Sequence, residues 1–416
     1  NTAFAALHVV TPNGPSLQHM IAQAAPGDVI EISGGNYAGN FIVDKPLTLQ
    51  GRENAILDGE GNGDVIRVRA EDVIIRDLTI KNAGRNLTYM NAGVFVEKTA
   101  VRFQLVNNRI DTSGFGVWLD ACKDASIIGN KVNGHEDVRS QDRGNGIHLY
   151  AVSGAQVIGN EIWHARDGIY IDTSNDNVLR DNIIHDLRYG IHYMYSHHNR
   201  VEGNRTYRTR TGYALMQSHH LEVFNNYSHE DQNYGILLNF ITYSVIAGNV
   251  VENARMGTSP GGGGDIGGAE GKALFVYNSL FNEVHDNIFT RSDIGIHLTA
   301  GSEDNFVWHN SFINNHVQVK YVATREQEWS RDGRGNFWSD YLGWDRNADG
   351  IGDRPYEPND AVDKLLWRYP TARILMNSPA VEILHWVQQY FPVMRPQGVR
   401  DSTPLMQPPQ TASDPT

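Results

Sequence analysis

A five-residue motif that carries soft metal ligands occurs twice in this sequence. Met194-Tyr-Ser-His-His198 and Met216-Gln-Ser-His-His220 both follow the pattern Met-x-Ser-His-His, and equivalent residues lie 22 positions apart. Thioether sulfur and imidazole nitrogen are ligands that select Cu(I), whereas hard cations prefer oxygen. A single methionine is better explained as a gap-filling core residue, but the repetition favours a metal site. The residues that we predict to bind copper are Met194, Met216, His192, His197, His198, His219 and His220.

A repeat of about 22 residues explains how the two copies of the motif meet. Segments of the form Gly–apolar–x–apolar recur, and an asparagine follows at a fixed distance in the order Asn130, Asn160, Asn182, Asn204, Asn226, Asn249, Asn287 and Asn310. The intervals between these asparagines are 30, 22, 22, 22, 23, 38 and 23 residues. Asparagine suits a turn because it tolerates left-handed backbone angles. Its amide can also bond to its counterpart in the next coil.

This periodicity predicts an all-β fold, a right-handed parallel β-helix in which each coil shares its core with its neighbours. Coils stack about 4.8 Å apart, so Met194 is expected beside Met216 and each histidine beside its counterpart. Strand alternation points His192 and Met194 outward on a face of aromatic, histidine and methionine residues. Exposed faces of that character usually contact a partner. We also expect His185 and His229 near this face, and the insertions at 135–142 and 256–264 as a lip beside it.

The repeat divides the chain into five regions. Residues 1–28 form an N-terminal segment with a helical cap at 16–25, and residues 29–321 form the β-helix. Residues 322–370 close it, residues 371–395 contain an amphipathic helix, and the Pro-rich residues 396–416 are expected to be disordered. The helix either packs on the β-helix or docks on a partner at the membrane surface. The apolar residues that would make this contact are Ile383, Leu384, Val387, Tyr390 and Phe391.

An Asp-rich loop in the closing region resembles the first half of a calcium loop. Asp345, Asn347, Asp349 and Asp353 place oxygens at alternating positions around a Gly turn, which suits Ca²⁺. The distal glutamate of an EF-hand is missing. The alternative is an Asx turn that closes the last coil.

Composition excludes several classes of function. The chain has 35 Lys and Arg against 48 Asp and Glu, a net charge of −13, which argues against sequence-independent nucleic-acid binding. Its one cysteine, Cys122, excludes an internal disulfide framework and a Cys-based metal cluster. No apolar run reaches the length of a membrane-spanning helix. Because the sequence begins with Asn1, we interpret it as a processed chain from which a secretory signal has been removed.

An enzymatic function is the alternative to copper binding. Polysaccharide lyases and glycosidases of the parallel β-helix type use paired carboxylates on a sheet face. Asp120 and Asp172 share one outward column two coils apart, which is about 10 Å. That separation is wide for a catalytic pair, and the outer face lacks the Lys and Arg that uronate substrates need. We therefore predict that the protein is not an enzyme.

The β-helix repeats, the two Met-x-Ser-His-His motifs and the terminus Asn336-Phe-Trp-Ser-Asp-Tyr341 with Asp349-Gly-Ile-Gly-Asp353 together resemble the NosD family. These are periplasmic copper-binding accessory proteins of nitrous oxide reductase maturation in denitrification. The resemblance covers nearly the whole chain. It implies docking on an ABC transporter formed by NosF and NosY, Cu(I) delivery from the chaperone NosL, and assembly of the copper–sulfide centre of nitrous oxide reductase. Membrane contact would then occur only through the transporter. The resemblance assigns no copper ligands.

Overall fold

The computed structural model describes residues 5–256, 270–322, 325–359, 379, 383, 387 and 398–409. These residues belong to two compact units, Asn1–Gln232 and Asn233–Thr416. Within the described residues, no helix has both the length and the apolar character needed to cross a membrane.

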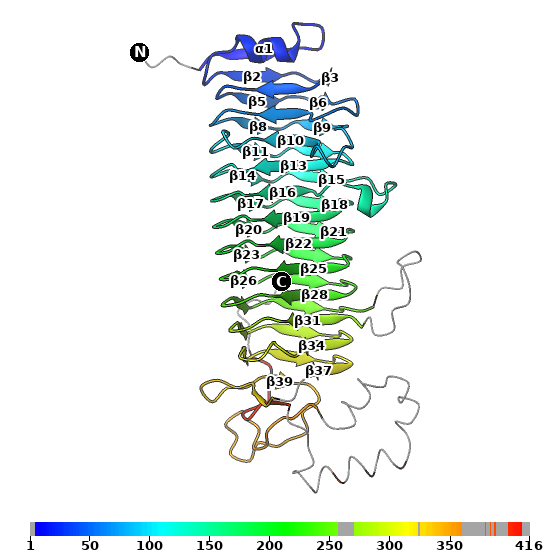
Figure 1. The fold of residues 1–416 in the computed structure, drawn as a ribbon, viewed down its shortest axis with the longest axis vertical. Coiled ribbons are helices and arrows are strands. Elements are labelled where there is room, and N and C mark those ends of the chain that lie inside the picture. The colour runs from blue at the N-terminus through cyan, green and yellow to red at the C-terminus, as the bar shows by residue number, and fades with distance from the viewer. Residues whose placement is uncertain are drawn as a thin grey trace. The chain divides into compact units, whose positions relative to one another are not determined.

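The first unit is a stack of coils that forms three parallel sheets, which we call A, B and C (Figure 1). Sheet A contains β1 (Leu7–Val10), β2 (Val29–Ile32), β5 (Thr48–Gly51), β8 (Ile74–Arg76), β11 (Gln104–Val106), β14 (Ser126–Ile128), β17 (Gln156–Ile158), β20 (Val178–Arg180), β23 (Arg200–Glu202) and β26 (Glu222–Phe224). Sheet B contains β3 (Gly35–Ala38), β6 (Ala55–Asp58), β9 (Thr79–Lys81), β12 (Arg109–Asp111), β15 (Lys131–Asn133), β18 (Glu161–Trp163), β21 (Ile183–His185), β24 (Arg205–Tyr207) and β27 (Tyr227–His229). Sheet C contains β4 (Phe41–Val43), β7 (Ile66–Val68), β10 (Ala92–Val96), β13 (Phe115–Asp120), β16 (Ile147–Tyr150), β19 (Asp167–Asp172), β22 (Tyr189–Met194) and β25 (Thr211–Met216).

The second unit repeats the same three-sheet arrangement. Its A strands are β29 (Val245–Ala247), β32 (Glu283–His285) and β35 (Phe306–Trp308), and its B strands are β30 (Val250–Glu252), β33 (Ile288–Thr290), β36 (Ser311–Ile313) and β39 (Phe337–Trp338). Its C strands are β28 (Tyr234–Asn239), β31 (Lys272–Tyr277), β34 (Ile294–Leu298) and β37 (Val317–Tyr321). A short pair, β38 (Gln327–Glu328) and β40 (Val399–Arg400), completes it. A parallel β-solenoid with about 23 residues per turn is therefore confirmed, and its right-handedness stays a prediction.

The interior consists of the apolar columns expected from the repeat. The aliphatic residues three positions before the repeat asparagines are at most 2% exposed: Ile127, Val157, Leu179, Val201, Val223, Ile246, Val284 and Val307. The repeat glycines are required by close packing between coils. A Cβ on Gly168 would lie 2.5 Å from the carbonyl oxygen of Gly190 and 2.4 Å from Cγ2 of Ile184.

Buried asparagines form a hydrogen-bonded ladder in each unit, as predicted. In the first unit the Nδ2 of Asn160 donates to Oδ1 of Asn182 at 3.0 Å, and Asn182 donates in the same way to Asn204 at 2.8 Å. The explanation from backbone angles was wrong, because these asparagines do not have positive φ. The residue before each does, as in Gly159 and Asp181. Asparagine is needed here because its amide satisfies buried backbone groups of the adjacent coil.

A short helix covers the first coil, as the sequence predicted. Helix α1 (Leu17–Gln23) begins after Ser16, whose Oγ accepts a hydrogen bond from the backbone N–H of His19. Gln18 pairs its side-chain amide with both backbone groups of Ile42 on β4, at 2.8 and 3.2 Å. The helix thereby satisfies the open edge of sheet C, which would otherwise be available to another chain.

The last coil is closed by residues from the expected disordered tail. Within 396–416, residues 398–409 are ordered, and Val399–Arg400 forms strand β40. Asp401 is fully buried and accepts hydrogen bonds from the backbone of Asn336 and from Nε1 of Trp338, at 2.7 and 2.8 Å. Burial raises the pKa of Asp401 to about 6. Because Asn336 donates to the carboxylate of Asp401, this side chain ends the asparagine ladder of the second unit.

Most of the expected helix at 371–395 lies outside the described residues. Ile383 and Val387 are described as helical, and Leu384, Tyr390 and Phe391 are not described. Gly261 to Gly264 also lie outside the described residues. The helix and its transporter contact therefore remain predictions.

Candidate metal site

The paired histidines lie in turns that connect sheet C to sheet A. Ser196 and Asn199 anchor one such turn, because both are buried and both accept backbone N–H donors from the preceding coil, Ser174 N at 3.0 Å and Asn177 N at 2.8 Å. The two residues between these anchors, His197 and His198, are left to project outward. The serine of the Met-x-Ser-His-His motif is thus a structural residue. A sequence argument restricted to metal ligands misses this role.

Stacking of two such turns brings four imidazoles together, as predicted. The rings of His197 and His219 are parallel with centroids 3.7 Å apart, and those of His198 and His220 are 4.9 Å apart. Ligand nitrogens of His198, His219 and His220 all lie within 4.8 Å of one another. Among the described residues, this is the one group of three or more His, Cys, Asp or Glu side chains so arranged.

Two of these nitrogens are already hydrogen-bonded to each other. Nδ1 of His219 and Nδ1 of His220 are 2.8 Å apart, so one ring must donate a proton to the other. Two nitrogens bound at about 2.0 Å to one ion in tetrahedral or trigonal geometry are about 3.3–3.5 Å apart, so these two must separate by about 0.5–0.7 Å. A cation can therefore replace the shared proton without moving the turns far apart. The residues present fit a bound copper ion.

Protonation of two of the four histidines is disfavoured. Burial and the neighbouring imidazoles lower the pKa of His197, and burial, His220 and His198 lower the pKa of His219. Neutral imidazole is the form that ligates a metal. His197 contributes fewer free atoms, because its Nδ1 accepts the backbone N–H of His219 at 3.2 Å.

The two methionines occupy the outward position that precedes these turns. Met194 and Met216 are direct register partners on β22 and β25, and both are half-buried. The Oγ of Ser196 and the Oγ of Ser218 donate to the carbonyl oxygens of Met194 and Met216, each at 2.8 Å. The methionine pair and the histidine turns are thus joined rigidly through the backbone.

His192 faces outward as expected but lies apart from the histidine turns. Its Nδ1 is 3.0 Å from Oδ2 of Asp167, and its ring packs on Tyr170 with centroids 4.3 Å apart. It is 8% exposed, and its Nε2 is buried without a hydrogen-bond partner. His192 does not belong to the His198, His219 and His220 group, and its role as a copper ligand stays a prediction.

The expectation that His185 and His229 enrich this site was wrong. Both belong to sheet B, on β21 and β27. The ring of His185 stacks between Trp163 and Tyr207, with centroids 5.9 and 4.5 Å away. The 22-residue spacing predicts which residues stack, but it does not predict which sheet they belong to.

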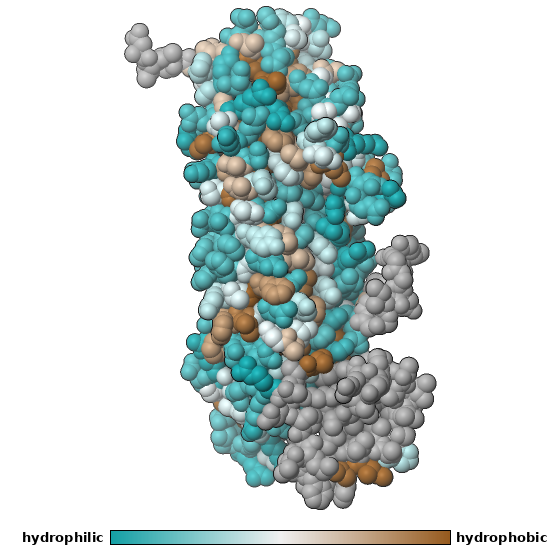
Figure 2. Space-filling model, viewed as in Figure 1, coloured by the Kyte–Doolittle hydropathy of each residue, from teal (hydrophilic) through white to brown (hydrophobic). Residues whose placement is uncertain are grey.

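The outer face of sheet C is less open than its composition indicates. Trp118, His148 and His192 are each at most 8% exposed, because rings of the same column cover one another. Over the first unit, Figure 2 shows hydrophilic residues predominating, with hydrophobic ones in small groups. The face therefore offers no broad apolar surface in that view.

The carboxylates of the enzymatic alternative occupy the predicted column. Asp120 pairs with Tyr150, which pairs with Asp172, and Asp172 is followed by Met194. Oδ1 of Asp172 accepts the hydroxyl of Thr173 at 2.9 Å. The two carboxylates are thus two coils apart, with a tyrosine between them.

The Asp-rich loop is held by its own hydrogen bonds. Oδ2 of Asp345 accepts the N–H of Gly350 at 2.8 Å, and Oδ1 of Asp349 accepts the N–H of Ile351 at 2.9 Å. The Nδ2 of Asn347 donates to Asp349, and Oδ2 of Asp353 accepts the N–H of Arg346. These contacts match the Asx-turn alternative, and calcium binding stays a prediction.

An arginine column on the other edge of sheet C was not predicted. Arg166, Arg188 and Arg210 repeat every 22 residues in the turns that enter sheet C, so the repeat itself carried the signal. The insertion at 135–142 lies on this side, since Arg143 donates to the carbonyl oxygen of His164. This insertion therefore borders sheet C at the edge where its strands begin, opposite the histidine turns. We expected the outer face of sheet C to lack Lys and Arg, and at this edge arginines are in fact concentrated.

Comparison with known proteins identifies relatives over most of the chain. Residues 128–343 match the family model described as periplasmic copper-binding protein (NosD). A probable ABC transporter binding protein NosD of Pseudomonas aeruginosa is 56% identical over 378 residues, which cover 91% of this chain and 88% of the relative. The protein of the same description from Stutzerimonas stutzeri is 53% identical over 397 residues, 92% of this chain and 91% of the relative.

Solved structures share the fold at low sequence identity. The A-module of the Azotobacter vinelandii mannuronan C-5 epimerase AlgE6 superposes with a TM-score of 0.62 at 15% identity, covering 77% of this chain and 92% of that one. The DFA-IIIase of Arthrobacter chlorophenolicus A6 gives a TM-score of 0.55 at 14% identity, with coverages of 72% and 93%. At such identities the likeness concerns the β-solenoid alone.

Proposed function

The chain belongs to the NosD family of periplasmic copper-binding proteins, and we propose that it binds Cu(I) at the paired histidine turns and passes the ion on. The observation that carries this proposal is the convergence of His198, His219 and His220 within 4.8 Å. His198 and His220 are exposed, so a partner protein can reach the site. An exposed site with three or fewer strong ligands releases its ion more readily than a closed tetrahedral site does.

Imidazoles alone do not distinguish copper from zinc, because both metals accept nitrogen ligands. The methionine pair supplies the distinction. Thioether sulfur favours Cu(I), and Met194 and Met216 stand on adjacent strands immediately before the histidine turns. We propose that the histidines provide affinity and the methionines provide selectivity for the reduced ion.

The relatives' description as probable ABC transporter binding proteins supports a transporter partner. We propose that this protein docks on the NosF/NosY ABC transporter, receives Cu(I) from the chaperone NosL, and supports assembly of the copper–sulfide centre of nitrous oxide reductase. The relatives are described as probable ABC transporter binding proteins and not as enzymes, which supports a non-catalytic role. The transporter would supply the only membrane contact, with no nucleic acid involved.

The test is a Cu(I) titration against a competing chelator under anaerobic conditions. We expect His198→Ala/His220→Ala to weaken Cu(I) binding about 100-fold, since it removes two of three nitrogen ligands. The matched control is His135→Ala/His164→Ala, which removes two partly exposed imidazoles from the turns that enter sheet C. Equal affinity of the two variants would sink the site.

A second variant separates selectivity from affinity. Met194→Leu/Met216→Leu keeps the side-chain volume nearly constant and removes both sulfur atoms. We expect it to reduce the preference for Cu(I) over Zn²⁺ about tenfold while leaving Zn²⁺ affinity unchanged. An unaltered preference would assign the whole site to the histidines.

The polysaccharide lyase or glycosidase function stays the alternative, with Asp120 and Asp172 as its carboxylates. Cleavage of a polyuronate that is lost in Asp172→Ala would establish it.

A further inference from the structure

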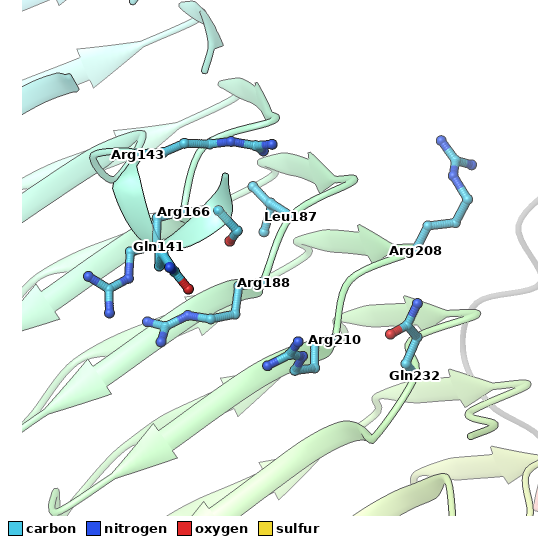
Figure 3. Close-up of a pocket in the computed structure, with 9 residues that line it drawn as sticks. Gln141, Arg143, Arg166, Leu187, Arg188, Arg208, Arg210 and Gln232 are labelled. Atoms are coloured by element: carbon cyan, nitrogen blue, oxygen red, sulfur yellow. The ribbon is translucent and has the colours of Figure 1, made fainter. Parts of the chain in front are cut away.

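A cavity of about 390 Å³ lies at the turns that enter sheet C (Figure 3). Five arginines line it: Arg143, Arg166, Arg188, Arg208 and Arg210. The 3₁₀ helix η1 (Ser140–Asp142), which belongs to the first insertion, forms part of its wall through Ser140 and Gln141. A protein with a net charge of −13 thus concentrates five guanidinium groups around one open cavity.

Two of these arginines are neutralised within the protein. Arg188 forms a bidentate pair with the buried carboxylate of Asp167, at 2.7 and 2.6 Å. Arg208 forms a similar pair with Asp186 at 2.8 and 2.7 Å, and Figure 3 shows it pointing away from Arg188 and Arg210. These two residues line the cavity but add little net positive charge to it.

Among the described residues, the other three arginines form no ion pair with a carboxylate, although Glu136 and Asp137 act on Arg143 from a greater distance. Arg143 donates to the carbonyl oxygens of Val138, His164 and Glu136, which carry no net charge. Nε of Arg166 is buried without a hydrogen-bond partner. Arg210 is exposed and has no carboxylate partner among the described residues. These guanidinium groups therefore leave positive charge at the cavity, which an anionic group can neutralise through paired N–H donors.

The spacing of the arginines limits what that ligand is. Arg166, Arg188 and Arg210 occupy successive coils, so their backbones extend over about 10 Å along the solenoid. One small oxyanion spans only part of that distance. Carboxylates on alternate residues of an extended peptide lie about 6.7 Å apart, so the side chains of Arg166 and Arg210 must converge by about 3 Å to meet two of them. Arginine binds carboxylates through two parallel N–H donors, which adds specificity.

We propose that this arginine cavity is the docking site for an acidic segment of a partner protein. Two carboxylates of the segment lie along the row and pair with Arg166 and Arg210. Arg188, held by Asp167, keeps the row in place between them. The histidine turns lie at the opposite edge of sheet C, so this site is separate from the proposed copper site.

The test measures binding of a fluorescent hexaglutamate peptide to the full-length protein by anisotropy at low salt. We expect Arg166→Gln/Arg210→Gln to weaken binding at least about tenfold, because it removes both guanidinium charges that face the segment. The control is Arg109→Gln/Arg205→Gln, which removes the same charge from exposed strand positions of sheet B. Both variants are checked for unchanged melting temperature.

Three outcomes decide the proposal. Loss of binding in the first variant and retention in the control support it, as does partial rescue by Arg166→Lys/Arg210→Lys, which restores charge without the bidentate geometry. Equal weakening in both variants would reduce the effect to net charge and overturn the docking site. The third outcome is competition by a small anion. If inorganic phosphate or citrate displaces the labelled peptide at lower concentrations than unlabelled hexaglutamate does, the cavity is a small-anion site and the proposal is overturned.

Discussion

The two edges of sheet C are built from the same repeat but have opposite chemistry. At the edge where the strands end, paired anchors such as Ser196 and Asn199 are buried and the two residues between them face solvent. At the edge where the strands begin, Arg166, Arg188 and Arg210 stack, and Asp167 ties the middle one to the sheet. The first edge gathers neutral nitrogen ligands, and the second gathers permanent positive charge.

This difference shows how a solenoid separates stability from function. The histidine turns are held by anchors that are not themselves ligands, so their outward residues can change at little cost. At the arginine edge, the buried carboxylate of Asp167 contacts both Arg188 and His192. A side chain of the arginine row is therefore itself part of the contacts that stabilise this edge. Substitutions are therefore expected to act differently at the two edges.

The largest expected effect is on stability at the arginine edge. Asp167→Ala leaves the Arg188 guanidinium without its carboxylate in a mostly buried position, and breaking such a pair costs about 3–5 kcal/mol. We expect the free energy of unfolding, measured by urea denaturation, to fall by about that amount. Asp186→Ala, which removes the half-buried partner of the exposed Arg208, is the control, with an expected cost of about 1 kcal/mol or less. Similar losses in both variants would contradict the central role of Asp167.

The next effect converts one histidine turn into its neighbour. His197→Asn/His198→Asp copies the outward residues of the preceding coil, Asn175 and Asp176, between unchanged anchors. We expect Cu(I) affinity to fall about tenfold with the loss of one of the three nitrogen ligands, while the melting temperature stays within about 2 °C because the anchors remain. A large drop in melting temperature would show that the imidazoles stabilise the fold.

The smallest effect concerns pH. Because burial and neighbouring imidazoles lower the pKa of His197 and His219 from the ordinary value of 6.5, we expect protonation of these two rings to weaken Cu(I) binding only as the pH falls below 6.5. Stability changes in the same direction, since the unfolded chain binds more protons than the folded one as pH falls through 6.5. A Cu(I) titration at several pH values checks this. A decline that begins above pH 7 would contradict it.

Much of the fold and part of the site were predictable from the sequence. The spacing of Asn160, Asn182 and Asn204 predicted the coil, the ladder and the pairing of Met194 with Met216. The repeat did not predict the contact between Asp167 and His192. These residues are 25 positions apart, so they are not register partners in the 22-residue repeat. It also did not predict that residues 398–409 return to close the solenoid, since the intervening chain carries no repeat.

The serine anchors have a consequence for how such a site can arise. Ser174, Ser196 and Ser218 bond one to the next at the same turn of three successive coils. Duplication of a single coil would therefore copy every outward residue to a position one strand away, with its anchor already in place. Two imidazoles at that separation can share one ion. A metal site can therefore originate by tandem duplication of a coil without any change in the fold.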